Sequence, residues 1–150
     1  MSKKGYQPPK WFKSLPQSRG HGSSVAQRKL WKLVSDKVRQ DEYKKYAGKC
    51  VSCHRRLDDW RDGQCAHYKA WSVCNGFFKY ETKNMALSCG YCNYVDDGAT
   101  GHAFGEELKR RYGPDHLEWI DKENEKHRGE RLEEIECVRR AAQILGYEMD

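Results

Sequence analysis

Apolar residues recur at helical spacing in the first third of the chain. Residues 24–46 contain neither glycine nor proline, and Trp31, Val34 and Val38 fall on one face of a predicted helix. Ser23 or Ser24 can cap its N-terminus. Basic side chains occupy much of the remaining surface, so the pattern predicts a basic amphipathic helix over residues 24–47.

The last third of the chain shows helical spacing interrupted by glycines. A short helix is predicted over residues 106–112, and Gly113 ends it. Pro114 suits the first position of a second helix, which extends to about Lys126. A third predicted helix follows Gly129, and its apolar face consists of Leu132, Ile135, Val138, Ala142 and Leu145. Residues 105–150 are therefore expected to form a helical C-terminal region.

Two segments lack this periodicity. Residues 1–23 carry three of the four prolines and scattered basic residues, which is typical of a flexible basic arm. Residues 48–104 contain short segments, paired cysteines and many aromatic residues, which indicate a small β-rich metal centre. The predicted fold class is α+β, with this centre flanked by the N-terminal basic helix and the C-terminal helices.

Charge is distributed unevenly along the chain. The net charge is +6, and residues 1–49 contain 13 basic but only 3 acidic side chains. A polyanion would bind this region best, and nucleic acid is the leading candidate. The predicted helix could instead present these charges only to water. The candidate DNA contacts on it are Arg28, Lys29, Lys32, Lys37 and Arg39.

The sequence gives no indication of a membrane or secreted protein. No apolar run approaches the roughly 20 residues that a membrane span needs, and the N-terminal segment lacks the apolar stretch of a signal peptide. We therefore expect a cytoplasmic protein. Seven cysteines in such a chain favour metal ligation over disulfides.

Four of the cysteines form two CxxC pairs, Cys50 with Cys53 and Cys89 with Cys92. In each pair the two-residue gap allows both thiolates to face one ion, so two pairs complete a tetrahedral structural zinc site. A redox CxxC would need a thioredoxin-like βαβ pattern, which the sequence lacks. The other three cysteines are expected to be buried apolar residues: Cys65, Cys74 and Cys137.

Polar residues with distinctive spacing lie between and after these pairs. His67 follows a predicted short strand, Asn84 comes five residues before the second pair, and Asn93 directly follows that pair. This arrangement resembles the HNH (ββα-metal) nuclease motif in its zinc-containing form, as in nucleases of the endonuclease VII type. The chain also resembles the NinG/Rap recombination proteins of lambdoid phages. The resemblance lies in the order of its motifs: the first CxxC pair, Ala66-His67-Tyr68, the turn that contains Asn84, the second CxxC pair and a charged helical tail.

The resemblance implies an HNH-type endodeoxyribonuclease that acts on branched DNA such as Holliday junctions and D-loops in the bacterial host. His67 would be the general base, because the ordinary pKa of histidine lies near neutral pH. Asn84 would organise the loop that holds His67, and Asn93 would bind a catalytic Mg²⁺ or Mn²⁺. Asp97 is the expected second ligand, with Asp96 and His102 as further candidates.

One departure from the HNH pattern supports a different class of protein. Many HNH enzymes have an aspartate immediately before the base, and this chain has Ala66. The alternative is therefore a non-catalytic zinc-containing module that binds DNA or a protein in phage recombination or replication. If the chain is an enzyme that resolves junctions, two symmetric cuts favour a homodimer. The remaining histidines are expected at the surface: His21, His54, His116 and His127.

Overall fold

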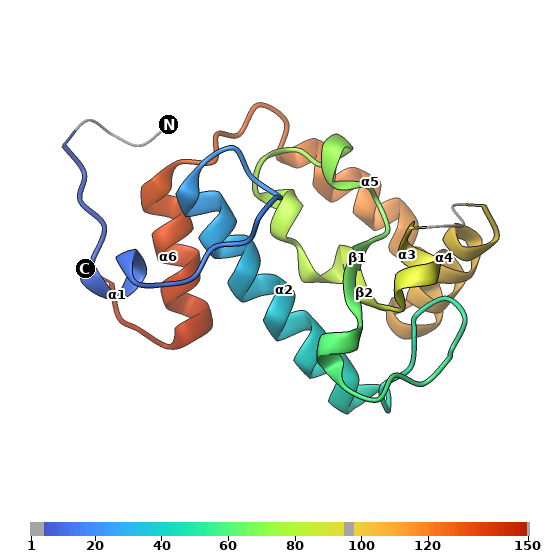
Figure 1. Ribbon diagram of the computed structural model, residues 1–150. Helices are drawn as coiled ribbons and strands as arrows, with labels where there is room; N and C mark the ends of the chain where they lie inside the picture. Colours follow the sequence, from blue (N-terminus) through green and yellow to red (C-terminus); the bar gives the residue numbers. More distant parts are fainter. Residues whose placement is uncertain (1–4, 95–97, 150) are drawn as a thin grey trace.

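The computed structural model describes residues 5–94 and 98–149 (Figure 1). The elements are α1 (Lys10–Lys13), α2 (Val25–Lys45), β1 (Gln64–His67), β2 (Met85–Ser88), α3 (Gly90–Tyr94), α4 (Gly98–Tyr112), α5 (His116–Lys126) and α6 (Glu134–Leu145), with short 3₁₀ turns η1 (Trp60–Asp62), η2 (Trp71–Val73), η3 (Gly76–Tyr80) and η4 (Thr82–Asn84). The predicted α+β class is confirmed.

The long helix α2 lies between α6 and the two strands (Figure 1). Ser24 caps it, because the Ser24 side chain accepts a hydrogen bond from the Gln27 backbone N–H. Its predicted apolar residues Trp31, Val34 and Val38 are all buried. The helix ends at Lys45, so the sequence placed both of its boundaries to within two residues.

The two strands form one antiparallel sheet, in which His67 pairs with Met85 and Gln64 pairs with Ser88. Side chains alternate between the faces of a strand. Ala66 and Ala86 accordingly belong to a core shared with α4 and α5, whereas Met85 belongs to the core on α2. Since helices cover both faces, every residue of β2 is buried.

The N-terminal segment differs from the flexible arm that was predicted for residues 1–23. Residues 10–13 form α1, and Phe12 is only 2% exposed in the core that α2 and α6 share. Trp11 packs against Tyr147 near the C-terminus, with ring centroids 4.7 Å apart. Burial of the aromatic rings contributes enough free energy to order a segment that composition alone indicates is flexible.

The C-terminal helices match the prediction in number and order, with two differences. Helix α4 begins at Gly98 rather than near residue 106, and Gly105 lies inside it. A Cβ at Gly105 would lie 3.0 Å from the Tyr68 ring, so this glycine permits close packing instead of marking a helix boundary. On α6, Val138 and Ala142 are buried as predicted, but Leu145 is 40% exposed.

The apolar face of α6 packs against α2 in the same chain. Cys137, Val138 and Ala141 all lie in the shared core. This face is therefore occupied within the chain, and it is not left open for a second copy. Within residues 5–94 and 98–149, no helix combines the length and apolar character needed to cross a membrane.

Candidate metal centre and adjoining cavity

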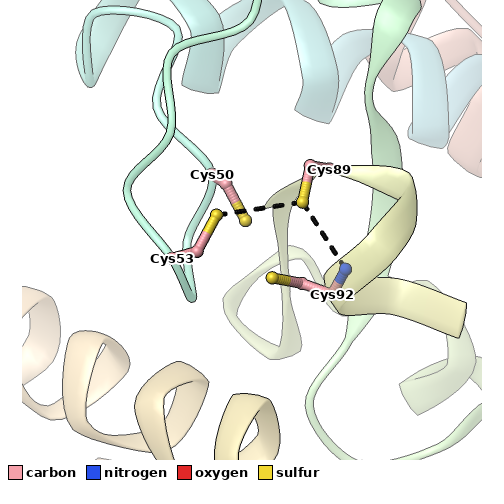
Figure 2. A group of neighbouring side chains, drawn as sticks. All are labelled: Cys50, Cys53, Cys89 and Cys92. Atoms are coloured by element: carbon pink, nitrogen blue, oxygen red, sulfur yellow. Dashed lines mark hydrogen bonds between the residues drawn. The ribbon is translucent and has the colours of Figure 1, made fainter. Parts of the chain in front are cut away.

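The four paired cysteines converge on one point at the end of the sheet. Cys50 and Cys53 come from the loop between α2 and β1, whereas Cys89 and Cys92 lie at the start of α3, as Figure 2 shows. Their Sγ atoms all lie within 4.8 Å of one another, and those of Cys53 and Cys89 are 3.9 Å apart. Four thiolates at the usual Zn–S distance would be separated by roughly 3.8 Å. The cluster therefore fits a structural zinc ion.

Backbone amides around the cluster favour thiolates. The Ser52 N–H donates to Cys50 Sγ at 3.4 Å, and the Cys92 N–H donates to Cys89 Sγ at 3.5 Å. Burial works to raise the pKa of Cys50, but backbone N–H donors from Cys89, Cys53 and Ser52 outweigh it and lower that pKa to about 6. A thiol that is readily deprotonated suits metal ligation.

The other three cysteines stay outside this cluster, as predicted. Cys65 Sγ contacts Met85 Sδ at 3.7 Å, and Cys74 Sγ donates to the Lys69 carbonyl oxygen at 3.4 Å. Cys137 is fully buried on α6, and burial raises its pKa to about 12. All three behave as protonated, packed thiols.

A cavity of about 580 Å³ adjoins the metal centre. Its walls come from α2, from β1 and the loop after it, and from α3 and α4; Ser52, Ser88 and Cys92 form the side nearest the cluster. His67 and Asn93 both line it. Two of the three polar residues of the sequence motif, His67 and Asn93, therefore line one cavity beside the cysteines.

His67 is the last residue of β1, and its surroundings fix its protonation state. Its Nε2 lies 3.1 Å from the Lys79 carbonyl oxygen. Because a carbonyl oxygen can only accept, Nε2 carries the proton and Nδ1 keeps its lone pair. Burial lowers the pKa of His67 to about 4, so the ring is neutral at pH 7.

Asn84 does not line the cavity but holds the loop beside it. The side chain is fully buried, and its Oδ1 accepts a hydrogen bond from the Lys69 N–H at 2.8 Å. The Asn84 carbonyl oxygen accepts another from the Tyr68 N–H at 2.8 Å. These bonds tie the chain directly after His67 to the turn that precedes β2.

The structure does not describe the expected carboxylate ligands. Asp96 and Asp97 lie outside the described residues, and His102 is exposed on α4. Ala66 is 4% exposed. Among the described residues that line the cavity, none is an aspartate or glutamate. Asn93 is therefore the one expected metal ligand that the described part of the chain places there.

Burial corrects the set of candidate DNA contacts on α2. Lys29 is 7% exposed, and its ammonium donates to the carbonyl oxygens of Phe12 and Lys13, so it secures α1 and cannot face DNA. Arg39 binds Asp36 and the Gly63 carbonyl oxygen. The remaining three candidates also have partners within the chain. Arg28 binds the Gln17 side chain and the Gly22 carbonyl oxygen, Lys32 binds Asp36, and Lys37 binds Asp41.

Of the histidines expected at the surface, His116 is buried, whereas His21 is exposed as predicted but also lines the cavity. His116 is 6% exposed and its Nε2 donates to the Lys83 carbonyl oxygen at 2.8 Å. His21 lines the cavity and stacks on Trp31. Neither placement follows from a local sequence pattern, because each depends on a long-range contact. His54 is exposed and His127 half-buried at the surface, where it pairs with Glu130.

An α+β chain with a four-cysteine cluster that fits a structural zinc ion defines a small metal-binding protein, and the family comparison is more specific. The family model described as "Bacteriophage Lambda NinG protein" matches residues 19–147. The chain belongs to this NinG family, which is associated with phage recombination, and the predicted membership is confirmed. No curated protein and no solved structure matches the chain.

Proposed function

We propose that this protein is an HNH-type, metal-dependent endodeoxyribonuclease that hydrolyses phosphodiester bonds in branched DNA, such as Holliday junctions and D-loops, in the cytoplasm of the bacterial host. One observation carries the proposal. His67, neutral and with a free Nδ1 lone pair, lines the same cavity as Asn93, and the order β1–β2–α3 around them is strand–strand–helix.

The residues of the cavity suit this reaction. In hydrolysis, a water molecule attacks phosphorus in line with the departing 3′ oxygen, and His67 Nδ1 takes the proton of that water. The P–O3′ bond breaks, and the 3′ oxygen leaves with a proton from solvent. The Lys79 carbonyl oxygen accepts from Nε2–H, so the neutral ring presents its Nδ1 lone pair to the water, and the imidazolium that forms keeps this hydrogen bond.

A divalent ion such as Mg²⁺ or Mn²⁺ would neutralise charge on the phosphate when it is bound. The amide oxygen of Asn93 is a suitable ligand for such hard cations. Helix α3 presents it in a fixed position, since the Asn93 N–H donates to the Cys89 carbonyl oxygen at 3.2 Å. The zinc cluster thereby orients Asn93. Asp97 is the second ligand in this proposal.

DNA binding is supported by a group of unpaired basic residues near the first CxxC pair. All are exposed, and none makes a side-chain hydrogen bond or ion pair with another described residue. We call this group the knuckle surface; it consists of Lys44, Lys45, Lys49, Arg55 and Arg56. Lys49 and Arg56 pair across an antiparallel bridge, so they lie side by side. Such unpaired cations are suited to phosphate contacts.

In this proposal, DNA contacts the knuckle surface instead of most of the α2 residues that the sequence indicated. Lys32 and Lys37 lie beside carboxylates, at 3.0 Å each, which cancels much of their local field. Ser52, which lies in the same loop as the knuckle surface, lines the cavity. The loop that carries Lys49, Arg55 and Arg56 therefore also borders the cavity that contains His67.

A non-catalytic zinc-containing DNA-binding module is the second candidate. Ala66 favours it, because this position, an aspartate in many HNH enzymes, is buried against Ala86 and supplies no ligand. The two candidates share the zinc cluster and the knuckle surface. They differ in whether His67 takes a proton.

The experiment that separates the two candidates compares wild type, His67→Ala and His127→Ala. His127 is a half-buried surface imidazole that pairs with Glu130 and does not line the cavity, so it serves as the matched control. Each protein is incubated with a labelled four-way junction or linear duplex in Mg²⁺, Mn²⁺ or EDTA. Metal-dependent cutting of the junction that only His67→Ala loses supports the nuclease, whereas binding without cutting in every metal supports the binding module. Two symmetric cuts per junction would further support a homodimer.

A further inference from the structure

The segment before α2 contributes His21 to the lining of the cavity. The His21 ring stacks on Trp31 with centroids 4.6 Å apart and lies edge-on to Trp71 at 5.1 Å. Its centroid is 6.2 Å from that of His67, and the two rings are within 16° of parallel. Two imidazoles from segments far apart in the sequence therefore face the same volume.

The backbone at this point is held in an uncommon conformation. His21 has a φ of 61°, in the left-handed region, and Gly22 follows with a φ of 148°. A Cβ at Gly22 would lie 2.6 Å from the Gln27 side chain, so only glycine fits. A left-handed residue other than glycine costs about 1–2 kcal/mol. Contacts of the next residues with α2, such as the Ser23 N–H with Gln27 Oε1 at 3.0 Å, stabilise the turn.

Packing alone does not require an imidazole here. His21 is exposed and stacks on Trp31, and within the described part of the chain neither of its ring nitrogens has a hydrogen-bond partner, so both are accessible to solvent or to a ligand. Burial lowers the pKa of His21, so the ring is neutral at pH 7 and one nitrogen remains a donor.

The surroundings of His21 favour an anion over a cation. The charged or titratable groups near it are Arg39 from α2, His67 from β1, Lys79 from η3, and Tyr68, Tyr94 and Cys65 on the cavity wall. Two of these are cations, of which Arg39 is paired with Asp36 at 2.6 Å and Lys79 donates to the Trp71 carbonyl oxygen; no described carboxylate lines the cavity itself. A phosphate oxygen is the ligand that an N–H donor in such a setting binds best.

We propose that His21 is a phosphate-contacting residue of this site. Its N–H donates to a non-bridging oxygen of the scissile phosphodiester while His67 accepts the proton of the attacking water. The inference rests on the proposed function for the cleavage step, but the contact with phosphate can be measured separately. If His21 contacts the phosphate, the segment before α2 is part of the site.

The cleavage test uses His21→Gly and His21→Asn, because both residues tolerate a left-handed φ. Glycine removes the donor, and asparagine keeps an amide donor on a shorter side chain. We expect His21→Gly to lower kcat on the four-way junction about 100-fold, the size of effect seen when an enzyme loses one hydrogen-bond donor to a developing oxyanion. His21→Asn should retain more activity, and His127→Ala, a surface variant outside the cavity, should match wild type. Equal kcat for wild type and a folded, zinc-loaded His21→Gly would overturn the proposal.

A second measurement works even if the protein does not cut DNA. The zinc-loaded protein is titrated with a thymidine dinucleotide, which has one phosphodiester, in the absence of other divalent ions. Imidazole NMR signals should show that the His21 pKa rises on binding, in wild type and in His67→Ala alike. No cleavage by wild type, with this shift intact, would refute the nuclease and still support the phosphate contact. An unchanged His21 pKa at saturating dinucleotide would refute the contact.

Discussion

Asn84 and Lys69, fifteen residues apart in the sequence, exchange two hydrogen bonds. Asn84 Oδ1 accepts from the Lys69 N–H at 2.8 Å, and Asn84 Nδ2 donates to the Lys69 carbonyl oxygen at 3.0 Å. The buried Asn84 side-chain amide thus provides hydrogen-bond partners for both the N–H and the C=O of Lys69, which lies two residues after β1. The loop that leaves His67 cannot shift without breaking both bonds.

Asn84→Ala should therefore lose stability and cleavage together. It leaves the Lys69 N–H without a partner and the Lys69 carbonyl oxygen with only the weak Cys74 thiol donor, which costs about 1–3 kcal/mol. Asn124 provides the matched control: its Oδ1 accepts from the Asn75 N–H at 2.6 Å and its Nδ2 donates to the Val73 carbonyl oxygen, away from the cavity. Denaturant unfolding and junction cleavage should both fall in Asn84→Ala, but only stability should fall in Asn124→Ala. Equal losses of cleavage in the two folded variants would show that Asn84 has no special relation to His67.

Zinc should be bound at one ion per chain, and it should be required for folding. Cys50→Ser or Cys92→Ser removes one of four thiolates, so metal content by mass spectrometry and the melting temperature should both drop. Cys65→Ala is the control, because Cys65 lies outside the cluster and contacts Met85. Full zinc content in Cys92→Ser would contradict the four-thiolate site.

The protonation of His67 gives a pH prediction. Its pKa is lowered to about 4, from an ordinary value near 6.5, chiefly by burial. A lowered histidine pKa contributes stability that is complete above pH 6.5 and is lost as pH falls through about 4. Denaturant unfolding between pH 7 and 4 should show this loss, and His67→Gln should have a flatter profile. Parallel profiles for the two proteins would mean that His67 titrates as an exposed histidine.

Arg111 joins three elements near the metal centre. It is 4% exposed, binds both oxygens of Glu42 on α2 at 2.9 Å, and also binds Glu107 on α4. Glu42 Oε1 in turn accepts from the Leu87 N–H of β2 at 3.1 Å. Arg111→Ala should cost about 3–5 kcal/mol by leaving the largely buried Glu42 carboxylate without a cation, whereas Glu107 keeps its pair with Arg110. Arg139→Ala, which breaks only an exposed pair on α6, should change the unfolding free energy by less than about 1 kcal/mol.

The sequence predicted what depends on local pattern and spacing. The boundaries of α2 follow from helical periodicity. The four-cysteine cluster follows from two CxxC pairs that one ion can join, and the positions of His67 and Asn93 relative to these pairs bring both residues to one cavity. The order of the two strands and α3 follows from the same spacing.

Features that depend on contacts between distant residues could not be predicted in this way. Lys29 looks like any other exposed lysine in the sequence, but α1 folds over it and its carbonyl oxygens bind the ammonium. His21 is likewise brought to the cavity by its stacking on Trp31. Composition correctly indicates that residues 1–23 are polar, yet two aromatic side chains are enough to pack part of this segment.

The knuckle surface leads to a prediction about the salt dependence of DNA binding. Each lysine that contacts a phosphate releases counterions, so its loss should reduce the slope of log K against log salt by about 0.9. Lys44→Ala combined with Lys45→Ala should therefore flatten the slope by about 2 and weaken binding to junction and duplex alike. The control pair, Lys32→Ala with Lys37→Ala, removes the same charge from lysines that already face Asp36 and Asp41. Those two should change the slope by much less, because their carboxylate partners disfavour phosphate contacts. If the control pair flattened the slope as much as the knuckle pair, the DNA would lie along α2, as the sequence alone suggests.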